Sequence, residues 1–298
     1  MADVPSPSPS SSAALRQGDS WRPLSARMWE EGEEPEPLFE DCPPFLDFAL
    51  REWTRGVAYE GLWRRIAMRF RLAAHPAGWE AAVTSVHATN WMLDVVDAVL
   101  HYYTLGEEPL DPYDAAELDQ ILLDAGSAWE MSDRADQLQR RVDETVQRAH
   151  LAAREGAAEA GRPAAAERLQ KAWAAVFGRH PDPGAAYRHA VAAVEDVACP
   201  KFLPQDPGPT LGKVRAHLAQ SAHLYEMVIS DSGGEPAPID GITAMVGLLW
   251  HGQRDRHEGG PTSAPITQEA AEEAVHIAGL LVTTFASGAL QRRPSGGS

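Results

Sequence analysis

The residues best suited to chemistry lie in one short stretch of the sequence, LLWHGQRDRHEGG, at positions 248–260. Imidazole titrates near neutral pH and can transfer a proton, and a guanidinium group binds phosphate oxygens. One interpretation of the stretch is therefore a site that binds phosphate and moves a proton, although these residues alone favour the alternative that follows. The alternative is a helix end only, because cations complement the C-terminal end of the helix dipole. The candidate residues are His251, Arg254, Asp255, Arg256 and His257.

A metal site is a second interpretation of the same residues. His251, Asp255 and His257 are all possible ligands, but the two histidines are six positions apart and lie on different sides of an ideal helix. No third strong ligand follows from the sequence. We therefore expect neither a metal nor a cofactor.

Glu195 is a possible support for this cluster from another segment. It lies in AAVEDVA, one position from an apolar stripe. It is either a carboxylate at the edge of the core that faces solvent, or a carboxylate directed at the arginines, which it would orient through a charge-assisted bond.

The elements that must position these residues have helical patterns almost throughout. From Pro43 onward, apolar residues recur every three or four positions, and no alternating β-branched segment is present. We predict one long helix over 78–103, with His87, Trp91 and Asp94 on one face, and another over 134–157. The expected fold is all-α, as two helical bundles or a bundle with an N-terminal helical extension.

Helix ends are marked most clearly in the C-terminal half. Asp182 is the expected N-cap of a helix that ends at Pro200, and Thr210 and Thr267 are the expected N-caps of two later helices. The helix that begins near Asp240 leads directly into the Arg/His cluster.

The composition limits the class of protein. The chain has 298 residues, 44% of them apolar, which is enough for one or two ordinary cores. The net charge of −17 argues against broad coating of nucleic acid, but allows a small basic pocket. With only two distant cysteines, no export signal and no apolar run of spanning length, we expect a cytoplasmic protein with no membrane partner.

The N-terminal residues differ from the rest. They include PSPSPSSS and then seven carboxylates between Glu30 and Asp41 without a cation, which is typical of a disordered acidic leader or an arm that binds a protein partner. We therefore expect a leader at 1–40, a helical region at 41–160, a C-terminal domain at 161–291 and a disordered tail at 292–298.

Three segments of the C-terminal half carry a resemblance to a known family. They are DPGAAYRHAVAAVEDVACPKFLPQDPGPTLGKVRAHL, MVGLLWHGQRDRHEGG and PITQEAAEEAVHIAGLLVTTF. Their order resembles the C-terminal domain of abortive-infection proteins, which belongs to the HEPN-like superfamily of helical bundles, over residues 165–290. The resemblance implies a metal-independent endoribonuclease, a toxin or antiviral effector, with its chemistry at the interface of a homodimer. The histidine would be the acid/base and the arginine would bind the phosphate of an RNA substrate.

The spacing departs from the family pattern. Family members of that kind place four to six residues between arginine and histidine, whereas two residues separate Arg254 from His257 and Arg256 is adjacent to it.

Two hypotheses therefore remain. In the first, the protein is a ribonuclease in bacterial defence or stress, with Arg254 and Arg256 on phosphate and His257 as the acid/base, supported by His251, Asp255 and Glu195. In the second, it is a catalytically inactive helical module for dimerisation, sensing or partner binding, which the acidic charge and the spacing favour.

Overall fold

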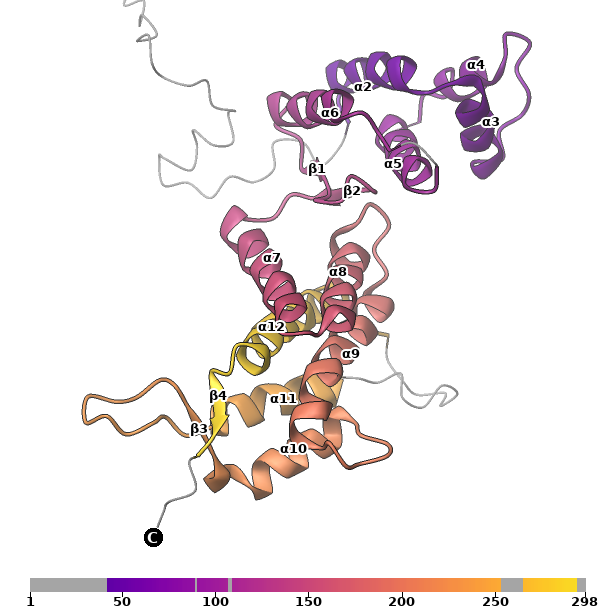
Figure 1. Ribbon diagram of the computed structural model, residues 1–298. Coiled ribbons are helices and arrows are strands. Elements are labelled where there is room, and N and C mark those ends of the chain that lie inside the picture. The colour runs from indigo at the N-terminus through magenta and orange to yellow at the C-terminus, as the bar shows by residue number, and fades with distance from the viewer. Residues whose placement is uncertain (1–41, 89, 107–108, 253–264, 294–298) are drawn as a thin grey trace, which may run out of the picture.

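The computed structural model describes residues 42–88, 90–106, 109–252 and 265–293. These residues are mostly helical, and the predicted all-α fold is confirmed. They form two helical units with separate hydrophobic cores, one following the other along the chain (Figure 1). Among the described residues, no helix combines the length and the apolar character needed to cross a membrane.

The N-terminal unit is built around one almost wholly buried helix. Its helices are α2 (Pro44–Val57), α3 (Glu60–Arg69), α4 (Trp79–Thr84), α5 (Trp91–Thr104) and α6 (Pro112–Asp124). Helix α5 is apolar around most of its circumference, and it packs against α2 and α3. Helix α6 covers α2, and the indole Nε1 of Trp53 donates to the backbone oxygen of Asp114 at 2.9 Å.

The C-terminal unit is centred on a long, alanine-rich helix. Its elements are α7 (Glu144–Glu159), α8 (Pro163–Phe177), α9 (Pro183–Phe202), α10 (Leu211–Gln220), η1 (Ala222–Leu224), β3 (Tyr225–Met227), α11 (Asp240–Gly252), α12 (Gln268–Ala286) and β4 (Leu290–Arg292). Helices α8 and α12 both pack closely on α9, because its buried Ala186, Ala190 and Ala193 leave room for neighbouring backbones.

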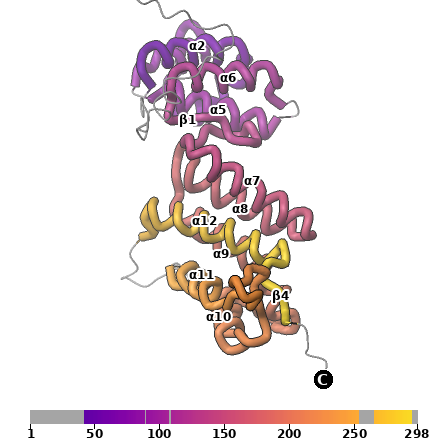
Figure 2. Tube along the Cα trace, turned by 90° about the vertical axis from the view of Figure 1, so that its left-hand side faces the viewer, coloured from indigo at the N-terminus to yellow at the C-terminus, as the bar shows by residue number. Residues whose placement is uncertain are grey.

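The change from one core to the other comes earlier than the boundary expected at residue 160. Helix α7 packs against α8 and α12, and its Ala153 and Ala157 belong to the C-terminal core. Leu138 is fully buried in the N-terminal core. The division therefore falls just before α7. In Figure 2, α7 and α8 lie on the side of the C-terminal unit that faces the N-terminal unit.

The single helix predicted over 134–157 is wrong. A short antiparallel hairpin precedes α7, formed by β1 (Trp129–Met131) and β2 (Leu138–Arg140). The side chain of Asp143 then accepts the backbone N–H of Thr145 at 2.8 Å and starts α7. Leu138 and Val146 share a helical spacing in the sequence but pack into different cores, which one straight helix does not allow.

The single helix predicted over 78–103 is also wrong. Helix α4 ends at Thr84 and α5 begins at Trp91, after Asn90 in the left-handed region with a φ of 62°. The Oδ1 atom of Asn90 accepts the backbone N–H of Cys42 at 2.7 Å, which fixes the start of α2 against this break. His87 lies outside the helices and is exposed, so it shares no helix face with Trp91.

The predicted N-caps of the C-terminal unit are confirmed. The side chains of Asp182, Thr210 and Thr267 accept the backbone N–H groups that begin α9, α10 and α12. Pro200 does not end α9, which continues to Phe202 with the proline inside it.

Candidate functional site

The cluster identified in the sequence lies mostly outside the described residues. Arg254, Asp255, Arg256 and His257 all fall in the gap between 252 and 265. The structure does describe His251, which is exposed in the last turn of α11.

The end of α11 is held by a close contact with α9. The hydroxyl of Tyr187 donates to the backbone oxygen of Leu249 at 2.9 Å. A Cβ atom at Gly252 would lie 2.1 Å from that hydroxyl, so any larger residue here would displace the Tyr187 side chain. Gly252 and Pro265, the residues on either side of the gap, line the same apolar pocket of about 390 Å³ between α11 and α12.

Glu195 has a structural partner elsewhere. Its Oε1 atom accepts the backbone N–H of Leu211 at 2.7 Å, and so satisfies the first turn of α10. Its contacts within the described part of the chain stabilise the α9–α10 packing and do not involve His251.

The two helical units meet through polar contacts. Three arginine–carboxylate ion pairs join the N-terminal unit and the hairpin to α7, α8 and the residues just after α8. They are Arg179 with Asp94 at 2.8 Å, Arg154 with Asp133 at 2.7 Å, and Arg134 with Glu167 at 2.8 Å. The backbone N–H of Arg179 also donates to the Leu138 oxygen at 3.2 Å. The junction therefore depends on directional polar bonds more than on a continuous core.

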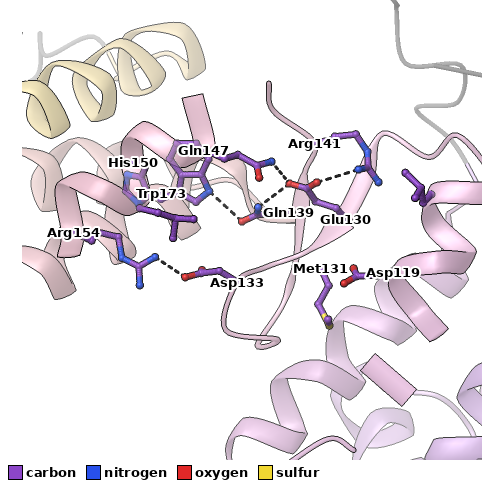
Figure 3. A pocket seen from close by; sticks show the side chains of 12 residues that line it. Asp119, Glu130, Met131, Asp133, Gln139, Arg141, Gln147, His150, Arg154 and Trp173 are labelled. Carbon is purple, nitrogen blue, oxygen red and sulfur yellow. Dashed lines mark hydrogen bonds and ion pairs between the residues drawn. The ribbon is translucent and has the colours of Figure 1, made fainter. Parts of the chain in front are cut away.

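A pocket of about 290 Å³ lies at this junction (Figure 3). Residues of α6, the β1–β2 hairpin, α7 and α8 line it, so both units contribute to it. They are Asp119, Leu123, Glu130, Met131, Asp133, Gln139, Arg141, Gln147, His150, Leu151, Arg154 and Trp173.

Glu130 on β1 is the central carboxylate of the pocket. Its Oε1 atom accepts hydrogen bonds from the side-chain amides of Gln139, at 2.9 Å, and Gln147, and its Oε2 atom lies 3.2 Å from Nη1 of Arg141 (Figure 3). Burial raises the pKa of Glu130, although these hydrogen bonds and the Arg141 charge oppose the shift. The hydrogen bonds therefore fix the position of this carboxylate. Burial makes its protonated form more favourable than it is in water.

His150 on α7 is a buried imidazole that lines the same pocket. It is 7% exposed and stacks on Trp173, with ring centroids 4.3 Å apart and an interplanar angle of 27°. Burial lowers the pKa of His150 to about 3, and the neighbouring charge of Arg154 adds to the shift. Its Nε2 atom is buried and has no hydrogen-bond partner within the described residues. A buried polar atom without a hydrogen bond lowers the stability of the folded state by about 1–3 kcal/mol.

Hydrogen bonds connect the remaining polar groups across the pocket wall. The indole Nε1 of Trp173 donates to Oε1 of Gln139 at 3.1 Å, which links α8 to the hairpin. Asp133 accepts from Arg154 and, at 3.3 Å, from the side-chain amide of Gln170. Asp119 lies on α6, and partial burial raises the pKa of its carboxyl group. A neutral imidazole and two carboxyl groups of raised pKa in the lining of one pocket can hold a ligand through hydrogen bonds.

Sequence reasoning missed this pocket. The residues concerned are divided between α6, a hairpin whose sequence pattern predicts a helix, and two helices of the other unit. The sequence carries no local signal for the hairpin, because WEM and LQR are only three residues long and Leu138 continues the helical spacing of Val142 and Val146. Within the described part of the chain, no group of three or more histidine, cysteine, aspartate or glutamate side chains could hold a metal ion.

Comparison with known proteins adds no relative. No family model, no curated protein and no solved structure matches the chain. The likeness to abortive-infection proteins therefore depends on the sequence segments quoted above, and function has to be argued from the site.

Proposed function

We propose that the protein binds a small polar molecule between its two helical units. The observation that carries this proposal is the junction pocket, about 290 Å³ in volume, with its central carboxylate on one element and a buried imidazole on another. Pockets that hold small molecules are concave, combine apolar walls with a few fixed polar groups, and often lie between domains. A volume of about 300 Å³ is at the lower end of the range for such sites.

The position of the pocket supports a sensing role. A ligand that contacts both Glu130 of the hairpin and His150 of α7 changes the free energy of the contact between the units. The junction is made of hydrogen bonds and ion pairs, such as the ion pair of Arg154 with Asp133. Rearranging these bonds costs less free energy than rearranging a packed core. In this proposal, ligand binding controls how the units are held together.

The proposal is tested by filling the pocket. Leu151 is a half-buried residue of the lining, and tryptophan at this position would occupy much of the space. We expect at least one compound in a panel of polar metabolites to raise the melting temperature of the wild-type protein. The same compound should leave the melting temperature of the Leu151→Trp variant unchanged. The matched control is Leu280→Trp, at a position on α12 that is 51% exposed and outside the pocket. If every stabilising compound acts equally on all three proteins, the junction is not a ligand site.

We also propose a second candidate, the ribonuclease hypothesis. Its support is the Arg/His-rich segment after α11, whose flanking residues, Gly252 and Pro265, line one pocket. In this proposal the protein is a cytoplasmic homodimer in bacterial defence, and the acidic leader binds a protein partner. Arg254 and Arg256 bind an RNA phosphate, and His257 acts as the acid/base when the 2′-hydroxyl attacks that phosphate. His251 and Asp255 support them.

Cleavage of RNA in EDTA tests the second candidate. We expect cleavage by the wild-type protein and none by His257→Ala. The control is His87→Ala, which replaces an exposed histidine of the N-terminal unit and should cleave as the wild-type protein does. If neither the wild-type protein nor the variants cleave a broad panel of RNAs, the ribonuclease hypothesis fails and the binding function is unaffected.

A further inference from the structure

We infer that the molecule held in the junction pocket is a small organic cation, with amine or guanidine groups on a short aliphatic stem. This inference rests on the proposed function. It names the chemical class that the pocket walls favour, and the walls supply three kinds of evidence: charge, hydrogen-bonding capacity and apolar surface.

The charge of the lining favours a cation. Three carboxylates, from Asp119, Glu130 and Asp133, and two guanidinium groups, from Arg141 and Arg154, line the pocket. Burial keeps the remaining titratable group, His150, neutral because its pKa is about 3. The lining therefore carries one more negative than positive charge, and a bound anion would lie beside three carboxylates.

The guanidinium groups are already engaged by protein acceptors. Arg141 donates to Glu130 and to the backbone oxygens of Ser127 and Trp129, and Arg154 donates to Asp133. A ligand carboxylate would have to compete for these arginines. A cationic ligand leaves both ion pairs intact.

Acceptors remain open on the same walls. Asp119 makes no ion pair within the described residues, and its carboxylate accepts the backbone N–H of Met131. Each carboxylate has about four acceptor positions, so Asp119 and Glu130 both retain capacity. A ligand ammonium or guanidinium group supplies donors that can reach such acceptors in charge-assisted hydrogen bonds.

The apolar part of the lining fits a short stem. Leu123, Met131 and Leu151 line the pocket together with the Trp173 ring. Methylene groups between two cationic ends would be removed from water against these side chains. The volume of about 290 Å³ limits the ligand to a small molecule.

The test compares three probes of similar length in calorimetry at physiological ionic strength: butane-1,4-diamine, butane-1,4-diol and adipate. We expect the diamine to bind at one site per chain, and the diol and adipate to bind at least tenfold more weakly. Asp119→Asn and Glu130→Gln should each weaken diamine binding by about tenfold or more, because each removes a charge-assisted bond. Glu117→Gln, on the same helix α6 but outside the pocket, should bind as the wild-type protein does.

Each other outcome has a distinct meaning. The diamine could bind equally well to Asp119→Asn, Glu130→Gln and Leu151→Trp. That result would show only general attraction of a cation to an acidic chain, and it would overturn the inference. Tighter binding of adipate or the diol, lost in Leu151→Trp, would overturn the cation class and leave the pocket as a ligand site. Failure of all three probes overturns the inference, and the proposed binding function fails as well only if the metabolite panel also gives no effect that depends on Leu151.

Discussion

The junction between the units and the C-terminal end of α11 differ in how their polar residues are presented. At the end of α11, the polar residues are consecutive in the sequence, and the one that the structure describes, His251, is exposed. At the junction, Glu130 and His150 are twenty positions apart, come from a strand and a helix, and are both largely removed from water. A sequence shows where reactive residue types lie close together along the chain. Burial, which shifts a pKa and makes each hydrogen bond costly to lose, is a tertiary property.

The largest effect that bears on this contrast is expected for Trp173→Ala. Trp173 is 4% exposed, stacks on His150 and donates to Gln139 of the hairpin. Removing it leaves a cavity and breaks the bond between α8 and the hairpin, so the free energy of unfolding should fall by about 3–5 kcal/mol. Urea denaturation followed by circular dichroism measures this.

His251→Ala is the matched change at the C-terminal end of α11. Because His251 is exposed, its replacement should alter the free energy of unfolding by less than about 0.5 kcal/mol. Equal effects of the two changes would remove the contrast between a buried junction and an exposed helix end.

An intermediate effect is expected for Arg179→Met. Its side chain is only 10% exposed, pairs with Asp94 at 2.8 Å and lies over the Trp129 ring at 4.6 Å. Loss of the charge leaves a half-buried carboxylate without its partner, so stability should fall by about 2 kcal/mol. Because the contact joins the units, we also expect the two units to unfold at more widely separated urea concentrations than in the wild-type protein.

Arg148→Met provides the control for this change. Arg148 and Glu144 form an exposed pair on α7 at 3.9 Å, as their spacing of four residues predicts, with side chains that are 67% and 83% exposed. Such pairs contribute little, and its loss should be barely measurable. If Arg148→Met destabilises as much as Arg179→Met, the junction ion pair has no special role.

A pH dependence of stability is expected from His150. Burial holds its folded-state pKa at about 3, below the ordinary value of 6.5, so the unfolded chain binds this proton more readily. The stability associated with neutral His150 is therefore complete above pH 6.5 and is lost as the pH falls toward 3. His150→Phe keeps a ring against Trp173 but does not titrate.

The measurement is the free energy of unfolding of both proteins between about pH 6 and pH 4. The difference between wild-type protein and His150→Phe should change by about 1 kcal/mol per pH unit, with the variant relatively more stable at low pH. Subtracting the two curves removes the opposite contributions of Glu130 and Asp119, whose pKa values are raised. Parallel curves would mean that His150 is protonated equally in the folded and unfolded states.

Local signals in the sequence were sufficient to predict the helical fold and many helix ends. The caps at Asp182, Thr210 and Thr267 depend on a side chain and a backbone N–H three residues away, so they can be read locally. The Glu144–Arg148 pair has the same local origin.

The interruptions of the helical patterns, and the meeting of the junction's polar residues, depend instead on tertiary packing. The break before Glu144 arises because apolar residues with one helical spacing pack into separate cores, as Leu138 and Val146 do. The break at Asn90 has a left-handed backbone and a hydrogen bond to Cys42, which is 48 positions away in the chain. The junction pocket needs α6, the hairpin, α7 and α8 together. Its chemistry comes from burial of Glu130 and His150, and burial depends on contacts between residues that are distant in the chain.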